Sequence, residues 1–293
     1  MVAPAAGRNY LAGNGERAAA AYTDFMEVRR SVSVGQLLRQ WRERRKLSQL
    51  GLAQETGISA RHLSFLETGR AKPGRDTLQV LARALDVPLR GRNELLTAAG
   101  FAPVYRETPF DAPEMDQVRR AIGFMLRQHE PYPAIVLDRH WNIVAANRAM
   151  DRVTALFLSP EAAANAGAPN IMRLTYHPEG LRTWIVNWRE TASAYVQWLY
   201  RDLLRTGDPK TGALLDELLA FPGVPREWLS LDLDASTLPY LAMEFRKGDV
   251  ELRFFTTIAS LGTPYDITLH ELRIESFFPA DDPTEAALRA LAG

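Results

Sequence analysis

Residues 47–73, LSQLGLAQETGISARHLSFLETGRAKP, constrain the fold more than any other part of the chain. Apolar residues recur there every three or four positions, which is the spacing of a helix buried along one side, and the register changes at Gly57. Ser48 and Ser59 stand where two short helices would begin, and serine is a preferred N-cap. The segment predicts two short helices joined at a tight corner, with a buried face formed by Leu52, Ala53, Ile58, Leu63 and Leu66.

The outer face of the second helix predicts contact with double-stranded DNA. With the leucines turned inward, Ala60, Arg61, Ser64 and Phe65 face solvent. The second helix of a helix-turn-helix enters the major groove, where Arg61 is the best candidate for a guanine contact. At the first turn of the preceding helix, Gln49 can meet a phosphate. The expected DNA-binding residues are Gln49, Ser59, Ala60, Arg61, Ser64, Phe65, Arg70 and Lys72.

Charge is distributed unevenly along the chain, although the formal net charge is +0. Residues 34–101 hold 12 Lys and Arg against 6 Asp and Glu, whereas residues 102–293 hold 19 against 26. Helical hairpins that bind nothing share the apolar pattern, but a basic module of this kind favours a polyanionic partner and salt-sensitive binding. The candidate phosphate contacts are Arg39, Arg42, Arg44, Arg45, Lys46, Arg70, Lys72 and Arg75.

Residues 34–101 resemble the Cro and XRE family of phage-repressor helix-turn-helix proteins. The matching motifs are SQ at Ser48, the GIS turn at Gly57, LETG at Leu66, and LARALDVP at residues 81–88. The resemblance implies five helices and a recognition helix that reads bases with its first residues. It also implies a structural pair between Arg42 of the first helix and Glu67, which closes the recognition helix.

Length and composition predict two domains in a reducing compartment. A chain of 293 residues, 46% of them hydrophobic, can bury two cores, and without cysteine it forms neither disulfides nor thiolate metal sites. No secretory signal or apolar run long enough to cross a bilayer is evident, so we expect a cytoplasmic protein without a membrane partner. Residues 1–33 are expected to form a flexible tail.

A proline-rich linker, residues 102–115, is expected between the two domains, and an amphipathic helix over residues 116–128 should follow it. Residues 134–138 and 141–145 then predict two strands. They lead into a helix that begins at Asn147, which resembles the opening of a PAS domain.

The remainder of the second domain, residues 116–293, predicts an α+β fold. Two or so helices are expected between residues 170 and 204, followed by β-like alternation over residues 241–248, 250–260 and 267–281. The fold class is therefore α+β: a five-helix helix-turn-helix domain, then a PAS-like antiparallel sheet of about five strands with helices on one face.

The order of segments resembles the MmyB-like transcription regulators, which place an XRE helix-turn-helix before a PAS-like ligand-binding domain. The marks in the second domain are VLDRHWNIVAANRAM, HPEGLR and DITLHELRIESFFPAD. The resemblance implies a regulator whose DNA binding responds to a fatty-acid-like or other small apolar effector. We expect a homodimer that presents its recognition helices to half-sites about one DNA turn, ~34 Å, apart.

Aromatic residues of the second domain are the candidates for an effector pocket between sheet and helices. An aromatic stripe at helical spacing is more often plain core than a ligand-binding wall, and that alternative stays open at each position. Three polar residues among the candidates could hold a head group. The expected ligand-binding residues are Phe157, His177, Arg182, Trp184, Asn187, Trp188, Tyr195, Phe245, Phe254 and Phe255.

An enzyme and an interaction platform are the two alternative classes of function. The five histidines show no paired metal spacing, GDPKTG at residues 207–212 lacks the P-loop pattern, and no GxSxG elbow occurs, so we expect neither an enzyme nor a bound metal or cofactor beyond the apolar ligand. The adjacent Asp281 and Asp282 are expected to begin a helix at Pro283. The main alternative to a ligand sensor is a second domain that serves as a ligand-free dimerisation or protein-interaction platform.

Overall fold

A computed structural model describes residues 32–167, 169–229, 242–262 and 265–293. The chain divides into two compact units, Met1–Val104 and Tyr105–Gly293. The predicted tail lies almost wholly outside the described residues. Among the helices that the structure describes, none is long and apolar enough to cross a membrane.

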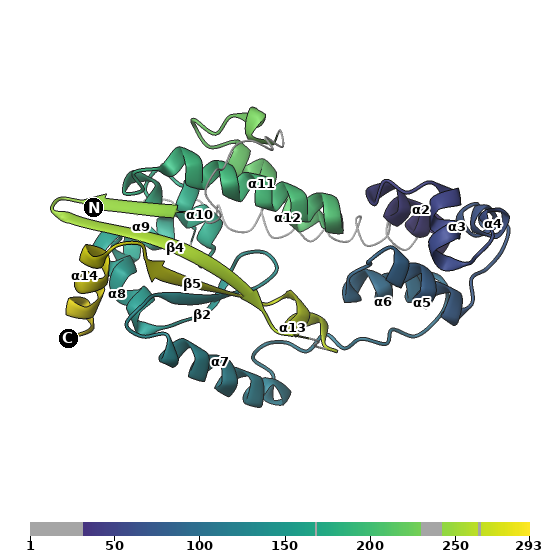
Figure 1. Cartoon of the computed structure of the whole chain (residues 1–293), viewed down its shortest axis with the longest axis horizontal. Coiled ribbons are helices and arrows are strands. Elements are labelled where there is room, and N and C mark those ends of the chain that lie inside the picture. Colours follow the sequence, from purple (N-terminus) through teal and green to yellow (C-terminus); the bar gives the residue numbers. More distant parts are fainter. Residues whose placement is uncertain (1–31, 168, 230–241, 263–264) are drawn as a thin grey trace, which may run out of the picture. The chain divides into compact units, whose positions relative to one another are not determined.

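The described part of the first unit is a bundle of five helices around one apolar core, as predicted (Figure 1). Serine side chains cap three of them: Ser33 accepts from the Gln36 amide, Ser48 from Gly51 and Ser59 from His62. The helices are α2 (Val34–Arg44), α3 (Gln49–Thr56), α4 (Ala60–Glu67), α5 (Arg75–Ala84) and α6 (Leu89–Ala98).

Two glycines fix how α3 and α4 are held. Gly57 ends α3 in the left-handed region at φ 72°, which glycine adopts without steric cost and which turns the chain toward α4. Gly35 of α2 lies against the end of α4, where a Cβ would approach the Leu66 carbonyl oxygen to 2.3 Å. A side chain there would push α4 away, so the bundle requires glycine.

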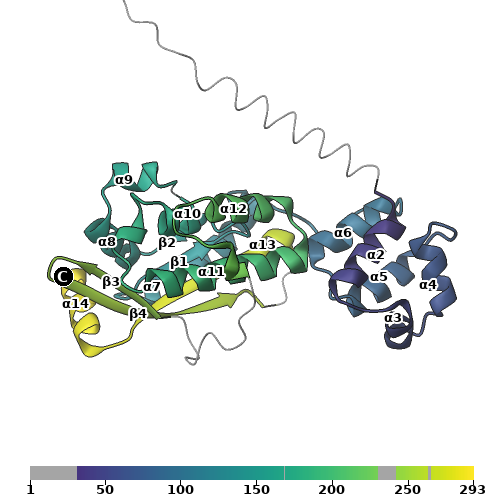
Figure 2. The ribbon, with the colours of Figure 1, turned by 90° about the horizontal axis from the view of Figure 1, so that it is seen from above.

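The second unit contains one antiparallel sheet of five strands in the order β2-β1-β5-β4-β3 (Figure 2). The central strand β5 lies between the hairpin of β1 and β2 and the hairpin of β3 and β4, so its residues are well buried. The strands are β1 (Ala134–Leu137), β2 (Ile143–Ala146), β3 (Ala242–Lys247), β4 (Val250–Ser260) and β5 (Arg273–Pro279).

Helices pack on both faces of this sheet, not on one as expected (Figure 1). Because side chains alternate along a strand, Ile135 and Leu137 of β1 join the main core, while Ala134 and Val136 face the opposite side and pack with α7. The helices are α7 (Asp116–Gln128), α8 (Arg148–Phe157), α9 (Pro160–Asn165), α10 (Ile171–Tyr176), α11 (Trp188–Thr206), α12 (Pro209–Leu219), α13 (Ile267–Glu271) and α14 (Asp282–Ala292), and short 3-10 turns lie at Pro113–Met115, Leu181–Thr183 and Arg226–Leu229.

The stretch 267–281 differs from its predicted strand. Its first five residues form α13, because the Asp266 carboxylate accepts hydrogen bonds from the amides of Thr268 and Leu269 and starts a helical turn. The strand begins only at Arg273. Asp266 also accepts a hydrogen bond of 2.6 Å from the Thr108 hydroxyl, which ties the segment predicted as a linker to this unit.

Candidate functional site

Helix α4 carries an aromatic ring between two arginines on its outer face. The guanidinium carbons of Arg61 and Arg70 lie 5.4 and 6.0 Å from the centroid of the half-buried Phe65 ring. Arg61 is exposed one residue into the helix, and Ser59 is occupied as its cap. The ring therefore holds two cations in position at the edge of α4.

A buried ion pair anchors the inner side of α4. Glu67 accepts hydrogen bonds from Arg42 at 2.6 and 2.9 Å, and a third of 2.9 Å from the side-chain amide of Gln49. Burial raises the pKa of Glu67, but these hydrogen bonds and the Arg42 charge outweigh it and leave that pKa below its usual value. The pair implied by the resemblance is present, and Gln49, expected at a phosphate, is held on Glu67.

Several other candidate phosphate contacts are held in ion pairs, whereas Lys72 is exposed. Arg42 is buried and paired, so it is unsuited to contact a phosphate, and Arg39 and Arg45 form ion pairs of 2.8 Å with Glu43 and Asp86. Lys72 is exposed beyond the end of α4. His62 is also exposed on α4, directly after Arg61, and was not among the expected DNA contacts. Its position inside the predicted recognition helix was the one sequence signal that pointed to it.

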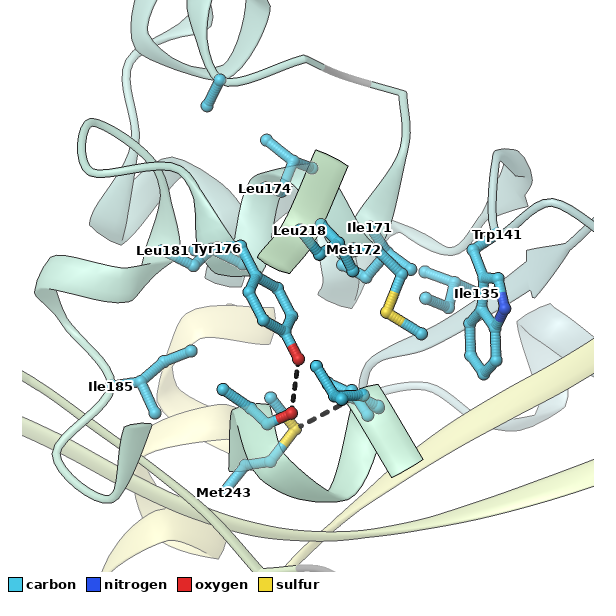
Figure 3. Close-up of a cluster of buried hydrophobic side chains, with 14 of the residues drawn as sticks. Ile135, Trp141, Ile171, Met172, Leu174, Tyr176, Leu181, Ile185, Leu218 and Met243 are labelled. Carbon is cyan, nitrogen blue, oxygen red and sulfur yellow. Dashed lines mark hydrogen bonds between the residues drawn. The ribbon is translucent and has the colours of Figure 1, made fainter. Parts of the chain in front are cut away.

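The second unit contains an apolar cavity of about 370 Å³ between the sheet and helices α8 to α10. Figure 3 shows part of the hydrophobic core of this unit, with the cavity-lining residues Ile171 and Leu174 of α10 and Met243 of β3 among the buried side chains. The Tyr176 hydroxyl donates a hydrogen bond to the Ala192 carbonyl, which joins α10 to α11. The cavity's apolar wall includes Ile143, Met150, Val153, Phe157, Leu158, Ile171, Leu174, Leu181, Met243, Phe245, Phe254 and Phe277.

Polar groups are few in this cavity. Tyr195 lines it, and its hydroxyl lies 3.3 Å from a carboxylate oxygen of Glu275 and 3.6 Å from the Met243 sulfur. Glu275 is fully buried on β5, and burial raises its pKa to about 7. The described lining residues include one carboxylate, that of Asp151, and no lysine, arginine or histidine. The cavity therefore suits an uncharged or largely hydrocarbon ligand.

Residues 118–291 match the MmyB-like transcription regulator ligand binding domain, and residues 38–91 match a helix-turn-helix family. The chain belongs to the MmyB-like transcription regulators. Its α+β second unit is the ligand-binding domain of that family, and its five-helix bundle is an XRE-type helix-turn-helix.

The HTH-type transcriptional regulators Rv0023 of Mycobacterium tuberculosis and Mb0023 of Mycobacterium bovis are each 35% identical to the chain over 109 residues. That match covers 37% of this chain and 38% of theirs. Multiprotein-bridging factor 1 of Candida albicans is 39% identical over 71 residues, 24% of this chain and 47% of that protein. The chain thus spans less than half the length of these relatives.

One solved structure, of an RNA-binding light-oxygen-voltage receptor, aligns over 98% of this chain and 68% of its own at 13% identity. Its TM-score of 0.27 is too low to support an argument about fold or function.

Four of the ten ligand-binding candidates line the cavity of this MmyB-like domain: Phe157, Tyr195, Phe245 and Phe254. Phe255 does not, because alternation along β4 turns it to the other face, where it stacks on Phe278 with ring centroids 5.1 Å apart. The aromatic pattern identified β4 as a strand beside the cavity, but it did not show which face of that strand lines the cavity.

The other five candidates lie outside the cavity lining. Trp184 and Asn187 belong to an extended segment that hydrogen-bonds along β3, with the Asn187 amide on the Ala242 carbonyl at 2.9 Å. The Trp188 indole donates to the Thr175 carbonyl at 3.1 Å, and the Arg182 guanidinium lies 3.9 Å over its ring. His177 packs its ring edge-on against Phe221. These contacts stabilise the fold around the cavity.

Apart from Phe157, the cavity wall contributed by α8 to α10 was not predicted from the sequence. Met150, Val153 and Phe157 recur at three and four residues along α8, so one face of that helix was readable as apolar. Nothing in the periodicity distinguishes a helix face on a cavity from one on a filled core. The aromatic residues in and before α11 were predicted as a group, but only Tyr195 lines the cavity, whereas Trp184 and Trp188 pack elsewhere.

Proposed function

We propose that this chain is a DNA-binding transcription regulator in which α4 reads double-stranded DNA and the apolar cavity takes a small effector. The observation that carries the proposal is the presence, in one chain, of an exposed Arg–Phe–Arg group on a helix-turn-helix and of a 370 Å³ cavity in a ligand-binding domain. Arg61 is proposed to read a base, Phe65 to position it, and Arg70 and Lys72 to contact phosphates.

The proposed effector is largely apolar and fatty-acid-like. The wall is hydrocarbon and aromatic, which rewards burial of an acyl chain, and the Thr154 hydroxyl could donate to a polar end. Because no cationic side chain belongs to the described lining, the hydrocarbon part of the ligand should supply most of the affinity.

Regulation is proposed to act through a homodimer. Two copies of α4 would meet half-sites about one DNA turn, ~34 Å, apart. An effector that prefers one arrangement of the two copies over another shifts their equilibrium by that difference in binding free energy and by no more.

A second candidate role for this domain is a dimerisation or protein-interaction platform without a ligand. It is favoured by α7, where Phe124 and Met125 are 57% and 46% exposed on a helix that otherwise packs on the sheet. Apolar side chains exposed together are typical of association surfaces.

A binding titration separates the two roles. The probe is cis-parinaric acid, a fluorescent fatty acid, added to the full-length chain. Val153→Phe places a ring into the cavity, and Val250→Phe, at an exposed strand end, is the matched control. The sensor role predicts saturable binding that weakens about tenfold or more in Val153→Phe and stays unchanged in Val250→Phe.

Equal affinity in the two variants would place the probe outside the cavity and remove the support for the sensor role. DNA reading is tested separately by selecting duplexes from a random library with the full-length chain. Enrichment of one motif by the wild type that Arg61→Ala loses supports the proposal, and failure of the wild type to enrich any motif contradicts it.

A further inference from the structure

A second hollow of about 350 Å³ lies in the α+β unit, and we call it the arginine pocket. Helix α11 supplies one wall through residues at helical spacing, and strands β4 and β5 supply the other. It shares no lining residue with the apolar cavity, and Tyr195 of that cavity contacts two of its rings, at centroid distances of 6.2 and 6.4 Å. The lining consists of Trp141, Trp198, Arg201, Asp202, Arg205, Ile258 and Arg273.

Two hydrogen-bond donors of the arginine pocket are buried without a partner. These are the indole nitrogen of Trp141, a residue only 3% exposed, and the Nη1 atom of Arg273. Buried polar atoms in native proteins nearly always have a partner, since leaving one unsatisfied costs more than a hydrogen bond returns. Two unsatisfied donors on residues that line one hollow leave hydrogen-bonding capacity that a bound acceptor can take.

The backbone also holds Trp141 in an unfavourable conformation. Its φ is 68°, in the left-handed region that bulky side chains rarely adopt. The turn that imposes this is fixed by Asp138, whose carboxylate accepts from the amides of His140 and Asn142 at 2.8 and 2.9 Å. Strain of this kind is concentrated at binding sites. Glycine would relieve it but would remove the indole from the pocket.

The charges of the pocket favour an anion. Three arginines face one carboxylate, Asp202, which lies 2.7 Å from Arg205 and 3.5 Å from Arg273. The Arg273 guanidinium carbon is also 4.7 Å over the Trp141 ring, which fixes its orientation. Glu275, the cross-strand neighbour of Ile258, does not line the pocket. A net positive charge therefore remains beside the unsatisfied donors.

We propose that the arginine pocket binds a small organic carboxylate that carries an aromatic or branched apolar group. Its carboxylate oxygens accept hydrogen bonds from the Trp141 indole and from Nη1 of Arg273. Its apolar group packs on Trp198 and Ile258, and Arg201 and Arg205 add attraction from the exposed rim. The volume falls within the range of small-molecule sites, roughly 300–1,000 Å³. This site is independent of the proposed effector cavity.

The test uses 3-phenylpropionate and its uncharged amide, 3-phenylpropionamide, with the full-length chain labelled with ¹⁵N at the tryptophan indoles. The Trp141 resonance is assigned from its loss in Trp141→Phe, with Trp184→Phe as a control outside the pocket. We expect the carboxylate to shift the Trp141 indole resonance saturably, and the amide to bind about tenfold more weakly or not at all.

Matched arginine variants locate the site. Arg273→Met keeps an unbranched side chain and removes the donors, whereas Arg246→Met removes an exposed arginine of β3 that pairs with Glu251 of β4. We expect affinity for 3-phenylpropionate to fall about tenfold in the first variant and to stay unchanged in the second. Equal binding of acid and amide, or full affinity in Arg273→Met, would overturn the proposal. An unshifted Trp141 resonance at millimolar acid would overturn it too, because the indole would then not donate to the carboxylate.

Discussion

The helical unit buries Arg42 and Glu67 and joins them through two hydrogen bonds, of 2.6 and 2.9 Å. The α+β unit buries Glu275 completely and leaves one of its carboxylate oxygens without a partner, as it does the Trp141 indole nitrogen. Among the described residues, every buried side-chain nitrogen or oxygen atom that lacks a hydrogen-bond partner belongs to this second unit.

This difference suits the two units to different tasks. A satisfied buried ion pair holds α4 in one orientation, as a helix that presents side chains to a fixed DNA groove requires. A unit with hollows and unsatisfied groups has free energy to gain from a molecule that fills or satisfies them.

The largest effect is expected from breaking the buried pair. Glu67→Ala leaves the Arg42 charge uncompensated and should destabilise the helical unit by about 3–5 kcal/mol. Glu43→Ala, which removes the exposed partner of Arg39, should leave stability nearly unchanged. Hydrogen exchange of peptides from α2 and α4 measures this unit alone. Similar protection in the two variants would show that the pair does not fix α4.

Glu275 should make the stability of the α+β unit fall as pH rises. Burial raises its folded pKa from 4.5 to about 7, so between these values the folded carboxyl keeps a proton that the unfolded one releases. The loss from pH 5 to pH 8 should approach roughly 3 kcal/mol.

Urea unfolding followed by tryptophan fluorescence checks this, since five of the six tryptophans lie in the α+β unit. Glu275→Gln should flatten the dependence over this pH range. A slope as steep in the variant as in the wild type would assign the titration to another group.

Arg61 and Lys72 should differ in the kind of binding they lose. Arg61→Ala should cost roughly 1–3 kcal/mol and relax preference at one base pair, because it removes the proposed base contact. Lys72→Ala should weaken binding to all sequences alike and lower the salt slope by about 1. Competition titrations on selected and mismatched duplexes over a salt series distinguish them. Uniform loss in Arg61→Ala would reassign that residue to a phosphate.

The smallest effect is expected from a pair of adjacent phenylalanines. Phe254→Leu alters the cavity wall and should change affinity for cis-parinaric acid about fivefold, equivalent to about 1 kcal/mol. Phe255→Leu alters the opposite face of the sheet and should not change it. A larger response at Phe255 would mean that the ligand binds the other face.

The helical unit could be predicted almost completely from the sequence. Its signals are local: Ser48 and Ser59 cap helices that begin at the next residue, and Gly57 turns the chain between them. Amphipathic spacing placed α7 over residues 116–128, and an N-cap residue placed the start of α8 at Asn147. The Arg42–Glu67 pair spans 25 residues and was inferred only from the family resemblance.

The cavity could be predicted only in part, because its position depends on contacts distant in sequence. Alternation along β4 separates Phe254 from Phe255 but does not tell which side of the sheet is hollow. The tryptophans 184 and 188 have the composition of a ligand box, yet they pack on β3 and α10. The unsatisfied Trp141 indole was beyond prediction, since it depends on a turn fixed by Asp138.

The most direct test of the account is the affinity of the full-length chain for a selected duplex, measured with and without saturating cis-parinaric acid, in the wild type and in Val153→Phe. Coupling between a cavity ligand and DNA predicts a change of roughly 5- to 150-fold in the wild type and no change in Val153→Phe. Identical affinity of the wild type in the two conditions, with the probe bound, would contradict the claim that the cavity controls DNA binding.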